Sequence, residues 1–119
     1  MNLTDLYEEE LEDLYAQVGK DSMLEGTNIF LPPKSQLIIR GKLWVKENYR
    51  KILLNLCKSK EFRLLIKNRN SFSKVEFASA LVDLLGAFTL GISPVLLSVI
   101  LVKNGYDLAC KEEDEGEAN

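Results

Sequence analysis

The sequence predicts an all-α, single-domain helical bundle of about five helices that ends in an apolar C-terminal helix pair. The chain has 119 residues, a length that fits one domain with its own core. Apolar residues make up 46% and charged residues 28%, which are ordinary globular values. Several segments repeat their apolar residues at helical spacing. We expect a helical domain over 1–110 and a disordered acidic tail over 111–119.

The first predicted helix covers residues 3–18. Its acidic residues fall on the side opposite its apolar residues, so the helix is amphipathic and acidic. Asn2 or Thr4 can cap its start, and Gly19 is a plausible stop. The apolar positions are Leu3, Leu6, Tyr7, Leu11, Leu14, Tyr15 and Val18.

Residues 19–36 contain glycine, proline and serine, and we expect a loop that Pro32 and Pro33 stiffen. A long helix is predicted next, over residues 35–58. A strand at 37–40 that turns at Gly41 is the alternative for its first part, because Leu37 to Ile39 fit either period. The predicted core stripe of the long helix is Leu37, Ile38, Trp44, Val45, Tyr49, Ile52, Leu53 and Leu56.

Two further helices are predicted in the middle of the chain. The first is short and covers residues 59–68. The second begins at a capping box, in which the Ser73 hydroxyl accepts from one free amide and the Glu76 carboxylate accepts from another. We expect this helix to extend to about Thr89.

The last helix begins at Ser93 and Pro94, a cap followed by a first-turn proline, and ends at Asn104–Gly105. It belongs to a stretch, 84–102, that has no charged side chain. This stretch is long enough to cross a membrane, but its glycines and Pro94 favour two buried helices. An apolar last helix is then either central or covered by another subunit.

Charge is strongly segregated along the chain. The net charge is −7 over residues 1–33, +9 over residues 34–69 and −5 over residues 70–119. Lys42, Lys46 and Arg50 are spaced four residues apart, so on a helix they share one side. This basic segment is a solvated face, a surface for an acidic partner or a surface for phosphate.

These charges predict a non-catalytic protein–protein interaction or adaptor module that docks on a protein partner or self-associates as a homo-oligomer. An acidic face and a basic face would be the complementary contacts. A nucleic-acid-binding accessory protein that uses the basic 34–69 surface is one alternative, and a small membrane protein anchored through 84–102 is another. The predicted interaction residues are Lys42, Lys46, Arg50, Lys51, Glu8, Glu9, Glu12 and Asp13.

The sequence gives no sign of catalysis. It contains no histidine, which excludes histidine-based triads and most zinc sites. Glycine-rich phosphate loops are also missing. Asp83 is the one acid embedded in an apolar run, and a helix cap, a pair with a lysine or a surface edge are simpler explanations for it than catalysis. We therefore expect no catalytic, metal-binding or cofactor-binding residues.

Cys57 and Cys110 show no metal-binding spacing. We expect a reduced pair of buried or half-buried side chains in helical segments, with a bridge between them as the alternative. Residues 1–20 contain acids and no basic segment followed by an apolar run, so no secretory signal is predicted. On these grounds we expect a cytoplasmic protein.

Overall fold

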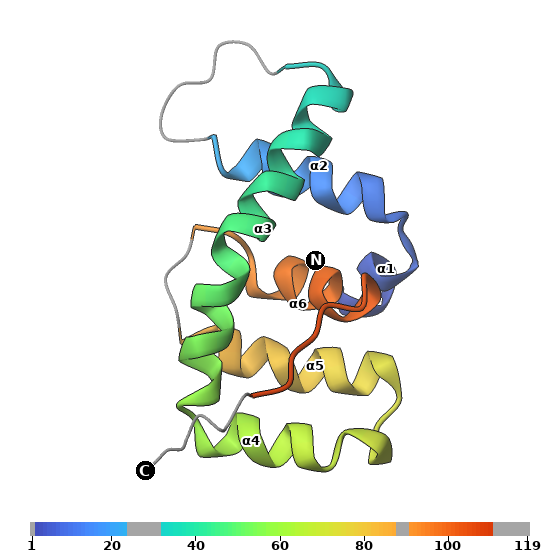
Figure 1. Ribbon diagram of the computed structural model, residues 1–119. Coiled ribbons are helices and arrows are strands. Elements are labelled where there is room, and N and C mark those ends of the chain that lie inside the picture. The colour runs from blue at the N-terminus through green and yellow to red at the C-terminus, as the bar shows by residue number, and fades with distance from the viewer. Residues whose placement is uncertain (1, 24–31, 88–90, 111–119) are drawn as a thin grey trace.

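The structure is a computed structural model that describes residues 2–23, 32–87 and 91–110, and every regular element in those residues is helical (Figure 1). This confirms the predicted all-α fold class. The elements are α1 (Leu3–Glu8), α2 (Leu11–Asp21), α3 (Lys34–Cys57), α4 (Lys60–Lys67), the short 3₁₀ turn η1 (Arg69–Ser71), α5 (Lys74–Leu85) and α6 (Pro94–Lys103).

The long helix α3 runs along one side of the molecule, and α2, α6, α5 and α4 lie one after another beside it from its first turn to its last (Figure 1). Helix α2 packs against α3, α6 packs against α2 and α5, and α4 packs against α5. Because α3 is covered from one side only, its other side faces solvent.

Helix α6 is the centre of the core. Every residue from Leu96 to Val102 is buried within the chain, so of the two predicted alternatives for an apolar last helix the central position is the one found. The one polar member, Ser98, is fully buried, and its hydroxyl donates to the Ala78 carbonyl at 2.5 Å. This bond removes the cost of burying an unpaired hydroxyl between α5 and α6.

The predicted first helix is wrong in one respect, because the chain breaks it into α1 and α2. Glu9 and Glu10 are extended, which changes the direction of the chain between the buried Leu6 and Leu14. The Lys103 ammonium donates to the Tyr7 carbonyl at 2.6 Å and also to that of Glu9. A cation from α6 thus satisfies the carbonyls that α1 leaves free at its end.

The predicted helix stop at Gly19 is wrong, because α2 continues to Asp21, whereas Gly41 lies in the predicted long helix and not in the alternative strand and turn. Both are buried where α2 crosses α3. A Cβ at Gly19 would overlap the Leu37 backbone, and one at Gly41 would overlap the backbone of Tyr15. The two glycines therefore allow the helices to approach closely.

Local signals placed most helix ends correctly. Asn2 caps α1, Ser59 caps α4, and Ser93 caps α6 with Pro94 in the first turn. The predicted stop at Gly105 is confirmed by its positive φ of 73°. Such a φ favours glycine because a Cβ would be strained there.

The capping box of α5 is confirmed and yields a prediction. The Ser73 hydroxyl accepts from the Glu76 amide at 3.0 Å, and the Glu76 carboxylate accepts from the Ser73 amide at 2.8 Å. We expect Ser73→Ala to lower the free energy of unfolding by about 1 kcal/mol, as typical for a lost cap. Urea unfolding measures this loss. Ser71→Ala is the control, because that exposed serine caps no helix, and an equal loss there would contradict the cap's role.

Parts of three predicted elements lie outside the described residues. These parts are 24–31 of the proline-containing loop, 88–89 of the fourth predicted helix and the whole acidic tail 111–119. Residues 106–110 follow α6 and contain no helix or strand. They form an extended segment that we call the strap.

Candidate functional site

The outer side of α3 carries large apolar side chains that face solvent. Ile39 is 58% exposed, Leu43 is 50% exposed and Leu54 is 67% exposed. Lys46 and Arg50 are also exposed, and helical spacing puts all five side chains on the same side of the helix. We call this set, Ile39, Leu43, Lys46, Arg50 and Leu54, the α3 stripe.

The sequence of α3 explains why this stripe is left outside. The opposite side of the helix carries the residues that enter the core, namely Leu37, Gly41, Val45, Ile52 and Leu56. Single exposed apolar residues are normal on protein surfaces, but an aligned set on one helix is typical of a contact surface. The α3 stripe is therefore the strongest candidate for a functional site.

A surface pocket of about 370 Å³ borders the stripe. Lys46 belongs to both, and Lys42 reaches over the Tyr15 ring with its ammonium 5.8 Å from the ring centroid. The remaining lining residues are Leu11, Glu12, Asn104 and Tyr106. The pocket thus joins the acidic α2, the basic α3 and the residues just after α6.

The base of this pocket is a hydrogen-bonded tyrosine. The Tyr15 hydroxyl accepts from the Asn104 side-chain amide at 2.8 Å and lies 3.3 Å from the Tyr106 hydroxyl. Burial raises the pKa of Tyr15 far above its ordinary value, and the Tyr106 hydroxyl raises this pKa further. Tyr15 is therefore a neutral hydroxyl at physiological pH, and the positive charge at the pocket comes from Lys42 and Lys46.

The structure brings together three of the predicted interaction residues and separates the others. Glu12, Lys42 and Lys46 line the same pocket. Asp13 forms an ion pair with Lys34 of α3. The acidic and basic faces therefore meet partly within one molecule, at the crossing of α2 and α3.

The remaining predicted residues lie elsewhere on the surface. Arg50 is on the α3 stripe, but Lys51 is the next residue in sequence and so points about 100° further around the helix axis. Glu8 ends α1 and Glu9 lies in the break before α2, where both are exposed. Glu9 lines a second surface pocket, of about 340 Å³, together with Asp5.

Sequence reasoning missed the apolar half of the stripe. The helical pattern predicted the core stripe of this helix and left Ile39, Leu43 and Leu54 unassigned. The signal was present, because each of these residues lies three or four positions from Lys46 or Arg50 or from another member. An apolar residue at the same helical spacing as a row of exposed basic residues lies on the same side of the helix and faces solvent with them.

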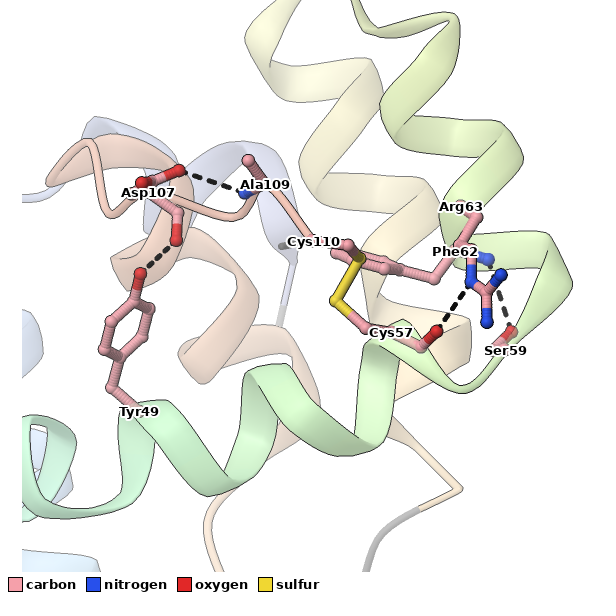
Figure 2. The surroundings of a disulfide bond; sticks show 8 residues. All are labelled: Tyr49, Cys57, Ser59, Phe62, Arg63, Asp107, Ala109 and Cys110. Carbon is pink, nitrogen blue, oxygen red and sulfur yellow. Dashed lines mark hydrogen bonds between the residues drawn. A yellow bond between two sulfur atoms is a disulfide. The ribbon is translucent and has the colours of Figure 1, made fainter. Parts of the chain in front are cut away.

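The expectation of a reduced cysteine pair is contradicted, because Cys57 and Cys110 form a disulfide with a Cα–Cα distance of 5.7 Å (Figure 2). The bond attaches the end of the strap to the end of α3. The Tyr49 hydroxyl donates to the Asp107 carbonyl, and the rings of Tyr49 and Tyr106 lie 4.9 Å apart. The strap is therefore fixed along α3 at several points, which periodicity along the sequence cannot reveal.

Metal clusters and membrane spans are two other features to consider in the part of the chain that the structure describes. In those residues, no group of three or more acidic or cysteine side chains is arranged to hold a metal ion. None of the helices in those residues combines the length and the apolar character that crossing a membrane requires. Asp83, the acid in the apolar run, is exposed on α5.

No protein-family model matches this chain, and neither a curated protein nor a solved structure is significantly similar to it. Function is therefore inferred from the chain's own residues.

Proposed function

We propose that this chain is a non-catalytic protein-binding module whose α3 stripe binds an acidic, amphipathic segment of a protein partner. The observation that carries the proposal is the alignment of Ile39, Leu43 and Leu54 with Lys46 and Arg50 on one uncovered side of α3. A partner that offers both apolar and acidic side chains matches both halves of this surface.

The apolar half can supply affinity. Full burial of an exposed leucine or isoleucine side chain contributes about 1.5–3 kcal/mol, so three half-exposed side chains contribute a few kcal/mol together. Ile39 and Leu54 are about 22 Å apart along the helix axis at 1.5 Å per residue. A partner helix of about four turns would cover this length.

The basic half can supply orientation and selectivity. Lys46 and Arg50 form no ion pair with any described residue, so both charges are available to carboxylates. Complementary charge accelerates association and disfavours partners of the wrong sign. The neighbouring pocket adds Lys42 at the edge of the stripe.

A partner of this kind fits better than self-association between the acidic and basic faces. Asp13 is already paired with Lys34, and Glu12 already shares a pocket with Lys42 and Lys46 in the same molecule. A second copy would have to compete with these internal neighbours. Glu8 and Glu9 remain exposed, so sedimentation of the wild-type chain tests self-association directly.

The test uses a synthetic, fluorescent four-turn peptide with leucines on one face and glutamates beside them. We expect the full chain to bind it, and Lys46→Glu/Arg50→Glu to weaken binding about tenfold or more, because two attractive contacts become repulsive. Lys51→Glu is the matched control. It reverses one charge, where the double variant reverses two, at the residue next to Arg50 but off the stripe, so we expect less than about twofold change.

A second variant separates apolar from electrostatic binding. Leu54→Ser is expected to weaken the peptide complex at both low and high salt, whereas the effect of the charge reversal should shrink as salt screens it. Equal weakening by Lys51→Glu, or no peptide binding at all, would contradict the proposal.

A titration with labelled duplex and single-stranded DNA at two salt concentrations addresses the nucleic-acid alternative. Tight binding that weakens steeply with salt would indicate that the basic surface binds nucleic-acid phosphates and not a protein partner.

The cytoplasmic location stays a prediction, although a disulfide is more typical of oxidising compartments.

A further inference from the structure

Helix α4 presents a second basic face, separate from the α3 stripe. Lys60, Arg63 and Lys67 are exposed on one side of it, around Leu64, which is 58% exposed. None of the three cations forms an ion pair with a described residue. Glu61 is on the same helix, but its carboxylate accepts from the Ser59 hydroxyl at 3.0 Å. We call Lys60, Arg63, Leu64 and Lys67 the α4 basic face.

The disulfide places the end of the strap beside this face. Cys57 ends α3, and α4 begins three residues later at Lys60. The Arg63 guanidinium reaches back to the same point, where its Nε donates to the Cys57 carbonyl at 2.8 Å (Figure 2). Cys110, bonded to Cys57, therefore lies close to the first turn of α4. The chain after Cys110 thus starts next to the α4 basic face.

The segment after Cys110 is strongly acidic. Residues 112–117 lie outside the described residues and carry five acids in the sequence EEDEGE. Six extended residues span about 20 Å, and an eight-residue helix is about 12 Å long, so this segment can reach every cation of α4. The first acid is two residues from Cys110, and so short a tether gives an effective concentration of the order of millimolar.

We propose that residues 112–117 bind the α4 basic face of their own chain and shield it from other acidic ligands. Charge complementarity selects the face, and the disulfide supplies the tether. The α3 stripe, in contrast, would stay open to a partner. The proposal does not depend on partner binding by α3, because it concerns other residues and an occupant within the chain.

The test measures how accessible the α4 lysines are in the full, oxidised chain. Limited acetylation with a lysine-selective ester, read by mass spectrometry, compares the wild type with a charge-neutral tail of the same length. The five substitutions are Glu112→Gln, Glu113→Gln, Asp114→Asn, Glu115→Gln and Glu117→Gln. We expect Lys60 and Lys67 to react about threefold more slowly in the wild type at low salt. Lys20, exposed on α2, is the internal control and should react equally in both.

Carbodiimide cross-linking then identifies which segment lies on the α4 basic face. We expect links between Lys60 or Lys67 and residues 112–117 in the monomer fraction, with fewer links at high salt. Equal acetylation of these lysines in both chains would overturn the proposal. Links that occur only in covalent dimers would overturn it too, because the occupant would then be the tail of a second copy. Links to Lys46 instead would assign the tail to the α3 stripe and also contradict it.

Discussion

Gly41→Ala is expected to lower the free energy of unfolding by about 3 kcal/mol or more, one of the two largest effects of a single site in this fold. The added Cβ would overlap the backbone carbonyl of Tyr15 in α2. Backbone on both sides of the contact cannot rotate away, so the helices would have to separate. The higher helix propensity of alanine stabilises the helix by only about 1 kcal/mol, which is less than the steric cost. Urea unfolding with an unchanged m-value measures the loss.

Gly86→Ala is the matched control for this prediction. Gly86 has ordinary helical angles, and its added Cβ would meet the Val82 and Asp83 carbonyls at 3.4 and 3.5 Å, which is normal contact. We expect a change within about 1 kcal/mol, in the stabilising direction. If Gly41→Ala were as stable as Gly86→Ala, the close crossing of α2 and α3 would be refuted.

Gly19→Ala tests the same crossing from the other helix. Its Cβ would overlap the Leu37 carbonyl. Both glycines allow the same close crossing of α2 and α3. If the first added methyl group forces the two helices apart, the second therefore meets less steric overlap. The double variant should therefore lose less than the sum of the two single losses.

Local features of the sequence were sufficient for much of the fold. Caps such as Ser73 and Ser93 act on amides a few residues away, so their spacing alone predicts a helix start. The composition of α6 also predicted that it would be covered, since a helix that is apolar on every side must be surrounded by its own chain or by another subunit.

Contacts between distant residues could not be predicted in the same way. Gly19 and Gly41 have meaning only once α2 and α3 cross, because each receives the backbone of the other helix. The Glu9 carbonyl, at the break between α1 and α2, accepts from Lys103, which is far away in the sequence. A pattern along one segment carries no information about such partners.

The candidate site could be predicted only in part, because its apolar residues are defined by how distant parts of the chain pack together. The charge ladder of Lys46 and Arg50 was visible as spacing along the chain. Which apolar residues remain uncovered depends on the side from which α2 and α6 approach, and the sequence does not state this side. Leu54 could have been core in a bundle that surrounded α3, but it is 67% exposed in this one.

Loss of the Cys57–Cys110 disulfide is the other change with a large expected effect. The cysteines are 53 residues apart, and closing a loop of this length in the unfolded chain corresponds to about 4 kcal/mol of stabilisation. Domains of this size are stable by about 5–15 kcal/mol in total, so the bond accounts for a large share. We expect Cys57→Ala/Cys110→Ala to lower the midpoint of urea unfolding accordingly.

The same experiment separates the disulfide from the packing of the strap. A dithiol reductant should lower the unfolding midpoint of the wild type and leave the double variant unchanged. Leu108 is fully buried in the core and lies between the Tyr49–Tyr106 ring contact and Cys110. We therefore expect the strap to stay docked in part, with faster hydrogen exchange at the Ala109 amide, which donates to the Asp107 carboxylate. An unfolding midpoint that reductant does not move would show that the bond adds no stability to the native chain.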